Sequence, residues 1–158
     1  MRLIIGLGNP GVEYTNTRHN VGCLLVDRLQ KSKLSVGMTA KKSEVFMNES
    51  GVFVKRLVDQ YKLNLNDLYV AHDDLDIPLG SYKIQFGVGP KIHNGVASVE
   101  AELGTKDFWR IRIGVDDRDL GDRTPGVKYV LQDFSGEEKE TLEAVLKKIC
   151  KEINHLLQ

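Results

Sequence analysis

Short apolar segments alternate with amphipathic helical patterns along this chain, and that alternation limits the possible folds more than any other feature. Residues 2–7 (RLIIGL) and 68–72 (LYVAH) are short apolar runs typical of buried strands. A helical pattern that begins at Ser50 lies between them. Strands that alternate with helices predict a single α/β domain over residues 1–158, with a mixed, mostly parallel central sheet flanked by helices.

Three further helices are indicated by the residues at their ends. Asn20 can cap the first of them. The second is expected over about residues 94–103, because Gly104 follows in the usual C-terminal position. Ser135 and Glu138 have the spacing of a capping box, which predicts a long last helix. The apolar stripes of the first and last of these helices are Val21, Leu24, Leu25 and Leu29, and Leu142, Val145, Leu146, Ile149, Ile153 and Leu156.

Two segments alternate strictly between apolar and polar residues, as half-covered strands do. They are residues 82–86 (YKIQF) and 109–115 (WRIRIGV). The second segment places Arg110 and Arg112 on the face opposite its apolar side chains. The simplest interpretation is that this arginine face is solvated. Residues 39–46 are a weaker candidate for an extended segment.

The composition excludes several classes of protein. The formal net charge is zero, so bulk charge does not indicate a nucleic-acid partner and any such site must be a local patch. No apolar run is long enough to cross a bilayer, and residues 3–7 are too few for the core of a signal peptide. Cys23 and Cys150 are far apart and are expected to be reduced, packed thiols. We therefore expect a cytoplasmic protein that does not bind membranes.

Residues 6–20 read GLGNPGVEYTNTRHN, and the first six letters have the G-x-G-x-x-G spacing of a dinucleotide-binding loop. That motif needs a helix that starts on the glycines and an acidic residue at the end of the next strand. Here the predicted helix starts near residue 20, and the acid in the required region, Asp27, lies in the middle of that helix. The spacing therefore does not predict a dinucleotide site, and we expect no cofactor.

The same loop can instead form one side of a crevice at the carboxyl edge of a parallel sheet, where open α/β folds bind ligands. Asn9 and His19 belong to the loop. Asp73 follows the second buried strand, and Asn94 starts a helix. If the two strands are parallel, Asp73 can accept a hydrogen bond from His19. A His–Asp pair with amide side chains and no obvious Ser or Cys nucleophile predicts a hydrolase in which a general base activates water.

Other polar residues in these segments have structural interpretations. Asp74 and Asp76 are interpreted as turn residues, because aspartate after a strand favours turns. His72 and His93 are interpreted as structural or supporting residues. Two amides that precede predicted helices are suitable N-caps, Asn48 and Asn94.

Four segments, in order, resemble the signature segments of bacterial-type peptidyl-tRNA hydrolases: GLGNPGVEYTNTRHNVG, FMNESG, AHDDLDIPLG and IHNG. The resemblance runs over nearly the whole chain. It implies an enzyme that hydrolyses the ester between a peptide and the 3′ ribose of tRNA, and so recycles tRNA from abandoned translation. It also implies a monomer that needs no metal.

The resemblance implies roles by matching position. His19 is the expected general base, Asp73 orients it, and Asn9 discriminates peptidyl-tRNA from unblocked aminoacyl-tRNA. The amides expected against the peptide backbone and the reacting ester are Asn48 and Asn94. The groups expected to line the substrate cleft are Tyr14, Phe46 and Met47, and the residue expected to grip the tRNA 5′ phosphate is Arg112.

This chain also departs from the family pattern. Lys91 and Ile92 replace two glycines next to His93. Gln85 replaces the usual lysine partner of Arg112, although Lys83 on the same strand face can supply a phosphate contact. The interval between His19 and Asn48 is short enough to have lost a strand or a hairpin, which predicts an exposed sheet edge. These departures leave an alternative open: an RNA-binding protein on the same scaffold with weak or no catalysis.

Overall fold

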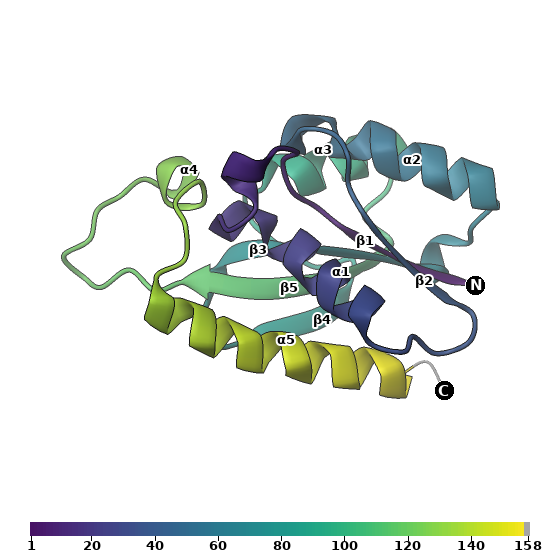
Figure 1. The fold of residues 1–158 in the computed structure, drawn as a ribbon. Helices are drawn as coiled ribbons and strands as arrows, with labels where there is room; N and C mark the ends of the chain where they lie inside the picture. Colours follow the sequence, from purple (N-terminus) through teal and green to yellow (C-terminus); the bar gives the residue numbers. More distant parts are fainter. Residues whose placement is uncertain (157–158) are drawn as a thin grey trace.

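The computed structural model describes residues 1–156 and contains a five-stranded sheet with the strand order β2-β1-β3-β5-β4 (Figure 1). The strands are β1 (Arg2–Gly6), β2 (Met38–Lys42), β3 (Leu68–Pro78), β4 (Tyr82–Phe86) and β5 (Trp109–Asp116). β1 is parallel to β2 and β3, and β3 is parallel to β5, whereas β4 runs antiparallel to β5. The prediction of a mixed, mostly parallel sheet is confirmed.

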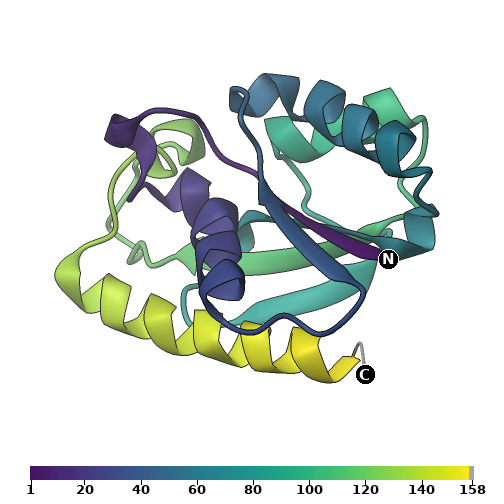
Figure 2. The same ribbon diagram turned by 45° about the vertical axis from the view of Figure 1, so that its right-hand side comes forward.

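Helices cover both faces of the sheet. α2 (Ser50–Tyr61) and α3 (Asn94–Leu103) pack on one face, and α1 (Val21–Lys31) and α5 (Gly136–Leu156) pack on the other (Figures 1 and 2). The short helix α4 (Gly126–Tyr129) lies outside these two layers. Within residues 1–156, no helix is both long and apolar enough to span a membrane.

The two-sided burial of the central strands explains their continuous apolar sequences. In β1, Ile4 packs with the cluster under α1 and α5, whereas Leu3 and Ile5 pack with the cluster under α2 and α3. The predicted stripe of α5 is buried as far as Ile153. The prediction is wrong for Leu156, which is 53% exposed because it lies in the last turn, beyond the core cluster.

The two arginines of β5 are buried, so the prediction of a solvated arginine face is wrong. Arg110 is 1% exposed and donates to the main-chain oxygens of Gly89 and Lys106. Its guanidinium also pairs with Glu100 of α3 at 2.7 Å. The alternation of residues 109–115 does identify the two faces of the strand. α3 and the loop of residues 87–93 then cover the face that carries the arginines.

The predicted helix ends are partly confirmed. α3 begins at Asn94 and is followed by Gly104 in the left-handed conformation, at φ 70°. The capping box is also confirmed, because Ser135 and Glu138 each accept a hydrogen bond from the main-chain N–H of the other.

The predicted asparagine caps are wrong. Asn20 makes no capping bond, because its side chain bonds the main-chain N–H and oxygen of Asn9. Asn48 lies inside the 3-10 turn Met47–Glu49, and Asn94 is the first residue of α3, where His93 is the cap.

The short segment between His19 and Asn48 leaves β2 at the edge of the sheet. Two contacts from α1 hold this strand. Lys42 pairs with Asp27 at 2.8 Å, and Gln30 donates to the main-chain oxygen of Ala40 at 2.9 Å. Lysine on an edge strand opposes pairing with another chain, which makes the exposed edge tolerable.

Candidate active site

His19 and Asp73 meet because β1 and β3 are parallel neighbours. The loop after β1 ends in the 3-10 turn Arg18–Asn20, and Asp73 lies in β3, two residues beyond the last position paired with β1. The Nδ1 atom of His19 lies 2.9 Å from Oδ2 of Asp73. The imidazole is 14% exposed and the carboxylate 3%. Since the carboxylate can only accept, Nδ1 donates and Nε2 keeps the lone pair of a base.

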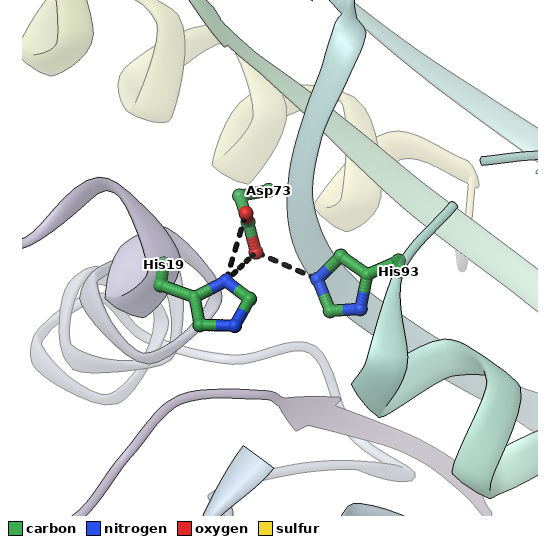
Figure 3. A group of neighbouring side chains, drawn as sticks. All are labelled: His19, Asp73 and His93. Carbon is green, nitrogen blue, oxygen red and sulfur yellow. Dashed lines mark hydrogen bonds and ion pairs between the residues drawn. The ribbon is translucent and has the colours of Figure 1, made fainter. Parts of the chain in front are cut away.

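His93 is a second partner of Asp73. Its Nε2 atom lies 2.7 Å from Oδ1 of Asp73, so one carboxylate joins two imidazoles (Figure 3). The two imidazole rings are 5.1 Å apart between their centroids. His93 was interpreted as a structural or supporting residue, and its direct bond to Asp73 was not predicted. The neighbouring Asn94 in IHNG is the one sequence signal that could have indicated it.

The two histidines set the charge state of Asp73. Burial by itself raises the pKa of this carboxyl, but electrostatic interactions and hydrogen bonds with the imidazoles of His93 and His19 outweigh that effect. The pKa of Asp73 is therefore held well below its ordinary value. Asp73 is a carboxylate at neutral pH and can accept both hydrogen bonds.

Three other titratable side chains, His72, Cys23 and Cys150, are less suited to chemistry at neutral pH. His72 is fully buried, and its Nδ1 donates to the main-chain oxygen of Asp73. Burial, together with the adjacent His93, lowers the pKa of His72 to about 3. Cys23 and Cys150 are free thiols, as expected, and burial raises the pKa of Cys23 to about 12. A thiol with so high a pKa is a poor nucleophile.

Asn9 is fixed in the wall of the site. Its Oδ1 accepts the main-chain N–H of Met47 at 2.7 Å, and Asn20 holds its main chain from the other side. With Oδ1 occupied, the group that Asn9 offers to a ligand is the Nδ2 donor. The bond to Met47 also ties the loop after β1 to the start of α2.

These residues border a cleft of about 630 Å³. Apolar side chains from several segments form most of its lining. The lining residues are Asn9, His19, Phe46, Met47, Asn48, Asp73, Leu75, Ile92, His93, Asn94, Gly126, Val127, Val130 and Leu131. All four residues predicted to be catalytic, and four of the five predicted to bind substrate, are therefore brought together; Asn94 belongs to both groups. The sequence analysis missed the cleft residues from the α4 segment. Their only signal in the sequence was the apolar residues of PGVKYVL, of which Val127 and Leu131 are exposed in the structure.

The remaining predicted site residues lie outside this cleft. Tyr14 packs edge-on against Phe46, with ring centroids 6.4 Å apart, and so supports the lining from behind. Arg112 is 8% exposed and pairs with Asp74 at 2.8 Å and with Gln85 at 2.7 Å. Lys83 is exposed, and its backbone lies opposite that of Arg112 in the register of β4 and β5.

Asp74 is a buried ion-pair partner of Arg112, so its interpretation as a simple turn residue is incomplete. Its Oδ1 does accept the main-chain N–H of Asp76, as in a turn, but Oδ2 is bound to Arg112. The side chain of Asp74 is 0% exposed. β3 also continues through this position to Pro78, well beyond the predicted strand end at residue 72.

His19, Asp73 and His93 also have the composition of a metal site, since their donor atoms lie within 4.8 Å of one another. The same atoms are hydrogen-bonded to each other, however. A metal would have to displace the protons that join them.

Comparison with known families gives a match over nearly the whole chain. The family model described as "Peptidyl-tRNA hydrolase" matches residues 3–158. The chain belongs to the peptidyl-tRNA hydrolase family. The peptidyl-tRNA hydrolase of Citrifermentans bemidjiense is 41% identical over 164 residues, which cover 92% of this chain and 85% of that protein. That of Desulfitobacterium hafniense is 38% identical over 170 residues, which cover 97% of this chain and 91% of that protein.

Solved structures agree with the family assignment. A crystal structure of peptidyl-tRNA hydrolase in complex with N-propanol superposes with a TM-score of 0.88 at 26% identity, covering all of this chain and 89% of that one. The peptidyl-tRNA hydrolase of Acinetobacter baumannii gives a TM-score of 0.85 at 26% identity, with 97% of this chain and 86% of that chain covered. A [NiFe] hydrogenase maturation protease from Thermococcus kodakarensis shares the fold alone, with a TM-score of 0.56 at 13% identity.

The departures of this chain from the family pattern do not close its cleft. Ile92 lines the cleft but is 89% exposed, so it stands on the rim rather than in the interior. The main-chain N–H of Lys91 donates to Asp76 at 3.1 Å, which anchors the loop to the end of β3. The substituted loop therefore keeps His93 and Asn94 at the cleft.

Proposed function

We propose that this chain hydrolyses the ester bond of peptidyl-tRNA, with water activated by the His19–Asp73 pair. The observation that carries the proposal is the 2.9 Å contact between these residues at the wall of an apolar cleft of about 630 Å³. A cleft of this size accommodates a short peptide. Membership of the family supplies the substrate class.

The proton transfers follow from the hydrogen bonds of His19. Because Nδ1 donates to Asp73, the lone pair of Nε2 is free to take a proton from water. The resulting hydroxide adds to the ester carbonyl and gives a tetrahedral oxyanion. When the C–O bond to the ribose breaks, the imidazolium returns its proton to the departing 3′ oxygen. The products are free tRNA and a peptide carboxylic acid, and Asp73 stabilises the imidazolium between the two transfers.

Amide donors can stabilise the charge that develops on the oxyanion. Asn9 has its Oδ1 occupied by Met47, which leaves Nδ2 as a donor at the cleft wall. Asn94 lines the same cleft next to His93. We assign these two residues to the reacting group, and Phe46, Met47 and Asn48 to the peptide, with Tyr14 bracing Phe46.

The tRNA phosphate contact is assigned to Lys83 first and Arg112 second. Lys83 is exposed on β4, whereas two hydrogen bonds hold the guanidinium of Arg112 inside the protein. Arg112 can reach a phosphate only if it gives up Asp74 or Gln85. We also propose that the enzyme acts as a monomer in the cytoplasm, where its substrate is formed.

The test is release of peptide from an N-acyl-aminoacyl-tRNA, measured for the native chain and for His19→Ala. The proposal expects hydrolysis by the native chain and a loss of roughly 10³-fold or more in the variant, as for removal of a general base. Both proteins should bind tRNA equally. If the native chain and His19→Ala bind tRNA but are equally inactive, the chain is an RNA-binding protein on a hydrolase scaffold.

A further inference from the structure

His93 is held at both ring nitrogens. Its Nδ1 atom lies 3.1 Å from the main-chain N–H of Val96, as the N-cap of α3. Its Nε2 atom lies 2.7 Å from Oδ1 of Asp73, and the side chain is 4% exposed. The imidazole therefore links the first turn of α3 to the carboxylate that orients His19.

These contacts define the tautomer of the ring. A main-chain N–H can only donate, so Nδ1 must carry a lone pair and the ring proton must sit on Nε2. That proton then points to Asp73, which as a carboxylate can only accept. A second proton on Nδ1 would face the N–H of Val96 and cost the helix its cap. His93 is therefore a neutral donor with a single orientation.

We infer that His93 is a positioning residue of the proposed reaction, because the cap of α3 fixes it as an Nε2–H donor to Asp73. By taking one lone pair of Asp73, it limits the negative charge that the carboxylate offers to the His19 imidazolium. A carboxylate with less negative charge stabilises the imidazolium form of His19 less than an unshared carboxylate would. This inference rests on the proposed function, since His19 must be the base.

The other charged and titratable groups around His93 do not supply this bond. His72 on β3 has its ring 5.2 Å away and is uncharged at neutral pH. Lys91, Lys106, Glu100 and Arg110 share a small pocket with His93, but Arg110 and Glu100 are paired with each other. Among the described residues, the hydrogen-bond partners of the His93 ring are Asp73 and Val96.

Two variants separate the cap from the bond to Asp73. His93→Asn keeps a good N-cap acceptor for Val96, but its shorter amide lacks a donor at the position of Nε2. His93→Gln offers one acceptor and a longer-reaching donor, so it can replace both contacts. We expect His93→Asn to keep the native melting temperature. In this variant, the pH at which kcat/KM declines on the acid side of the profile should rise by on the order of one pH unit. His93→Gln should return that pH to the native value. An unshifted limb in folded His93→Asn would overturn the inference.

A second measurement needs neither a variant that folds nor any activity. Long-range ¹H–¹⁵N NMR spectra of the native chain distinguish the tautomers of its four histidines. We expect His93 to show a protonated Nε2 and a bare Nδ1 throughout the pH range in which His19 titrates. A protonated Nδ1 on His93 at neutral pH would overturn the inference. Failure of the proposed function would appear separately, as an inactive native chain.

Discussion

The Nδ1 atom of His19 lies 2.9 Å from Oδ2 of Asp73, although the two residues are 54 positions apart in the chain. Parallel pairing of β1 with β3 brings them to the same edge of the sheet. Burial then strengthens the interaction, because the carboxylate is 3% exposed and water competes weakly for it. The pair is thus a product of the sheet topology, and the activity proposed for this chain depends on its geometry.

Asp73→Asn should abolish the base function of His19. His93 is a fixed donor, so it takes the amide oxygen of the new side chain and turns the NH₂ group towards His19. His19 must then accept at Nδ1 and carry its proton on Nε2, where the lone pair is needed. We expect kcat to fall by roughly 10³- to 10⁴-fold, the size found when a triad histidine is held in the wrong tautomer. Asp59 on α2 provides the control, as Asp59→Asn, because it is 62% exposed and pairs with Lys55 of the same helix. Turnover of Asp73→Asn at the native rate would contradict the mechanism.

Stability should fall with acid because of His72. The pKa of this buried imidazole is lowered to about 3 in the folded chain, against 6.5 in the unfolded chain. Between these values the unfolded state binds one more proton, so the free energy of unfolding decreases as pH falls, by at most about 1.4 kcal/mol per pH unit. Urea unfolding at pH 7 and pH 5 measures the effect. His72→Gln should flatten this dependence even if it lowers stability at pH 7. An equally steep dependence in that variant would assign the effect to other groups.

The buried pair of Asp74 and Arg112 should behave as a unit in stability measurements. Arg112→Met leaves the carboxylate of Asp74 buried without a counter-charge, which typically costs about 3–5 kcal/mol of unfolding free energy. Adding Asp74→Leu should recover much of that loss, because the pair is then replaced by packed apolar groups. Chemical denaturation of the two single variants and the double variant gives the coupling. Strict additivity would show that the two side chains act independently.

Lys83 should contribute to tRNA affinity through charge alone. In Lys83→Ala, the slope of log affinity against log salt concentration should decrease in magnitude by about one, because one phosphate contact is lost. Thermal stability should change little. Lys55 on α2 is a control, since its side chain is 42% exposed and is paired with Asp59. Lys55→Ala should leave the slope unchanged. If both lysine variants have the native slope, the phosphate contact must be sought elsewhere, with Arg112 the next residue to test.

Local chemistry was enough to predict the elements and some of their ends. The α3 helix lies where residues 94–103 predict it, because Gly104 adopts the left-handed conformation that ends a helix at little cost. The capping box at Ser135 likewise forms from residues three positions apart. The His19–Asp73 pair was also predictable, since parallel strands place their carboxyl ends at one edge of a sheet. Each of these predictions depends only on residues close together in the sequence or on the pairing of one pair of strands.

Only the tertiary structure determined which segments cover each face of the sheet. Alternation in β5 put Arg110 and Arg112 on one face, but their burial depends on where α3 and residues 87–93 pack. The bond from His93 to Asp73 likewise depends on the path of that loop back to β3. The sequence by itself therefore determined the α/β layout and the pairing of His19 with Asp73, through local periodicity and strand direction. Packing between distant segments determined the buried ion pairs and the second histidine, because desolvation and hydrogen bonding there depend on neighbours that no local pattern specifies.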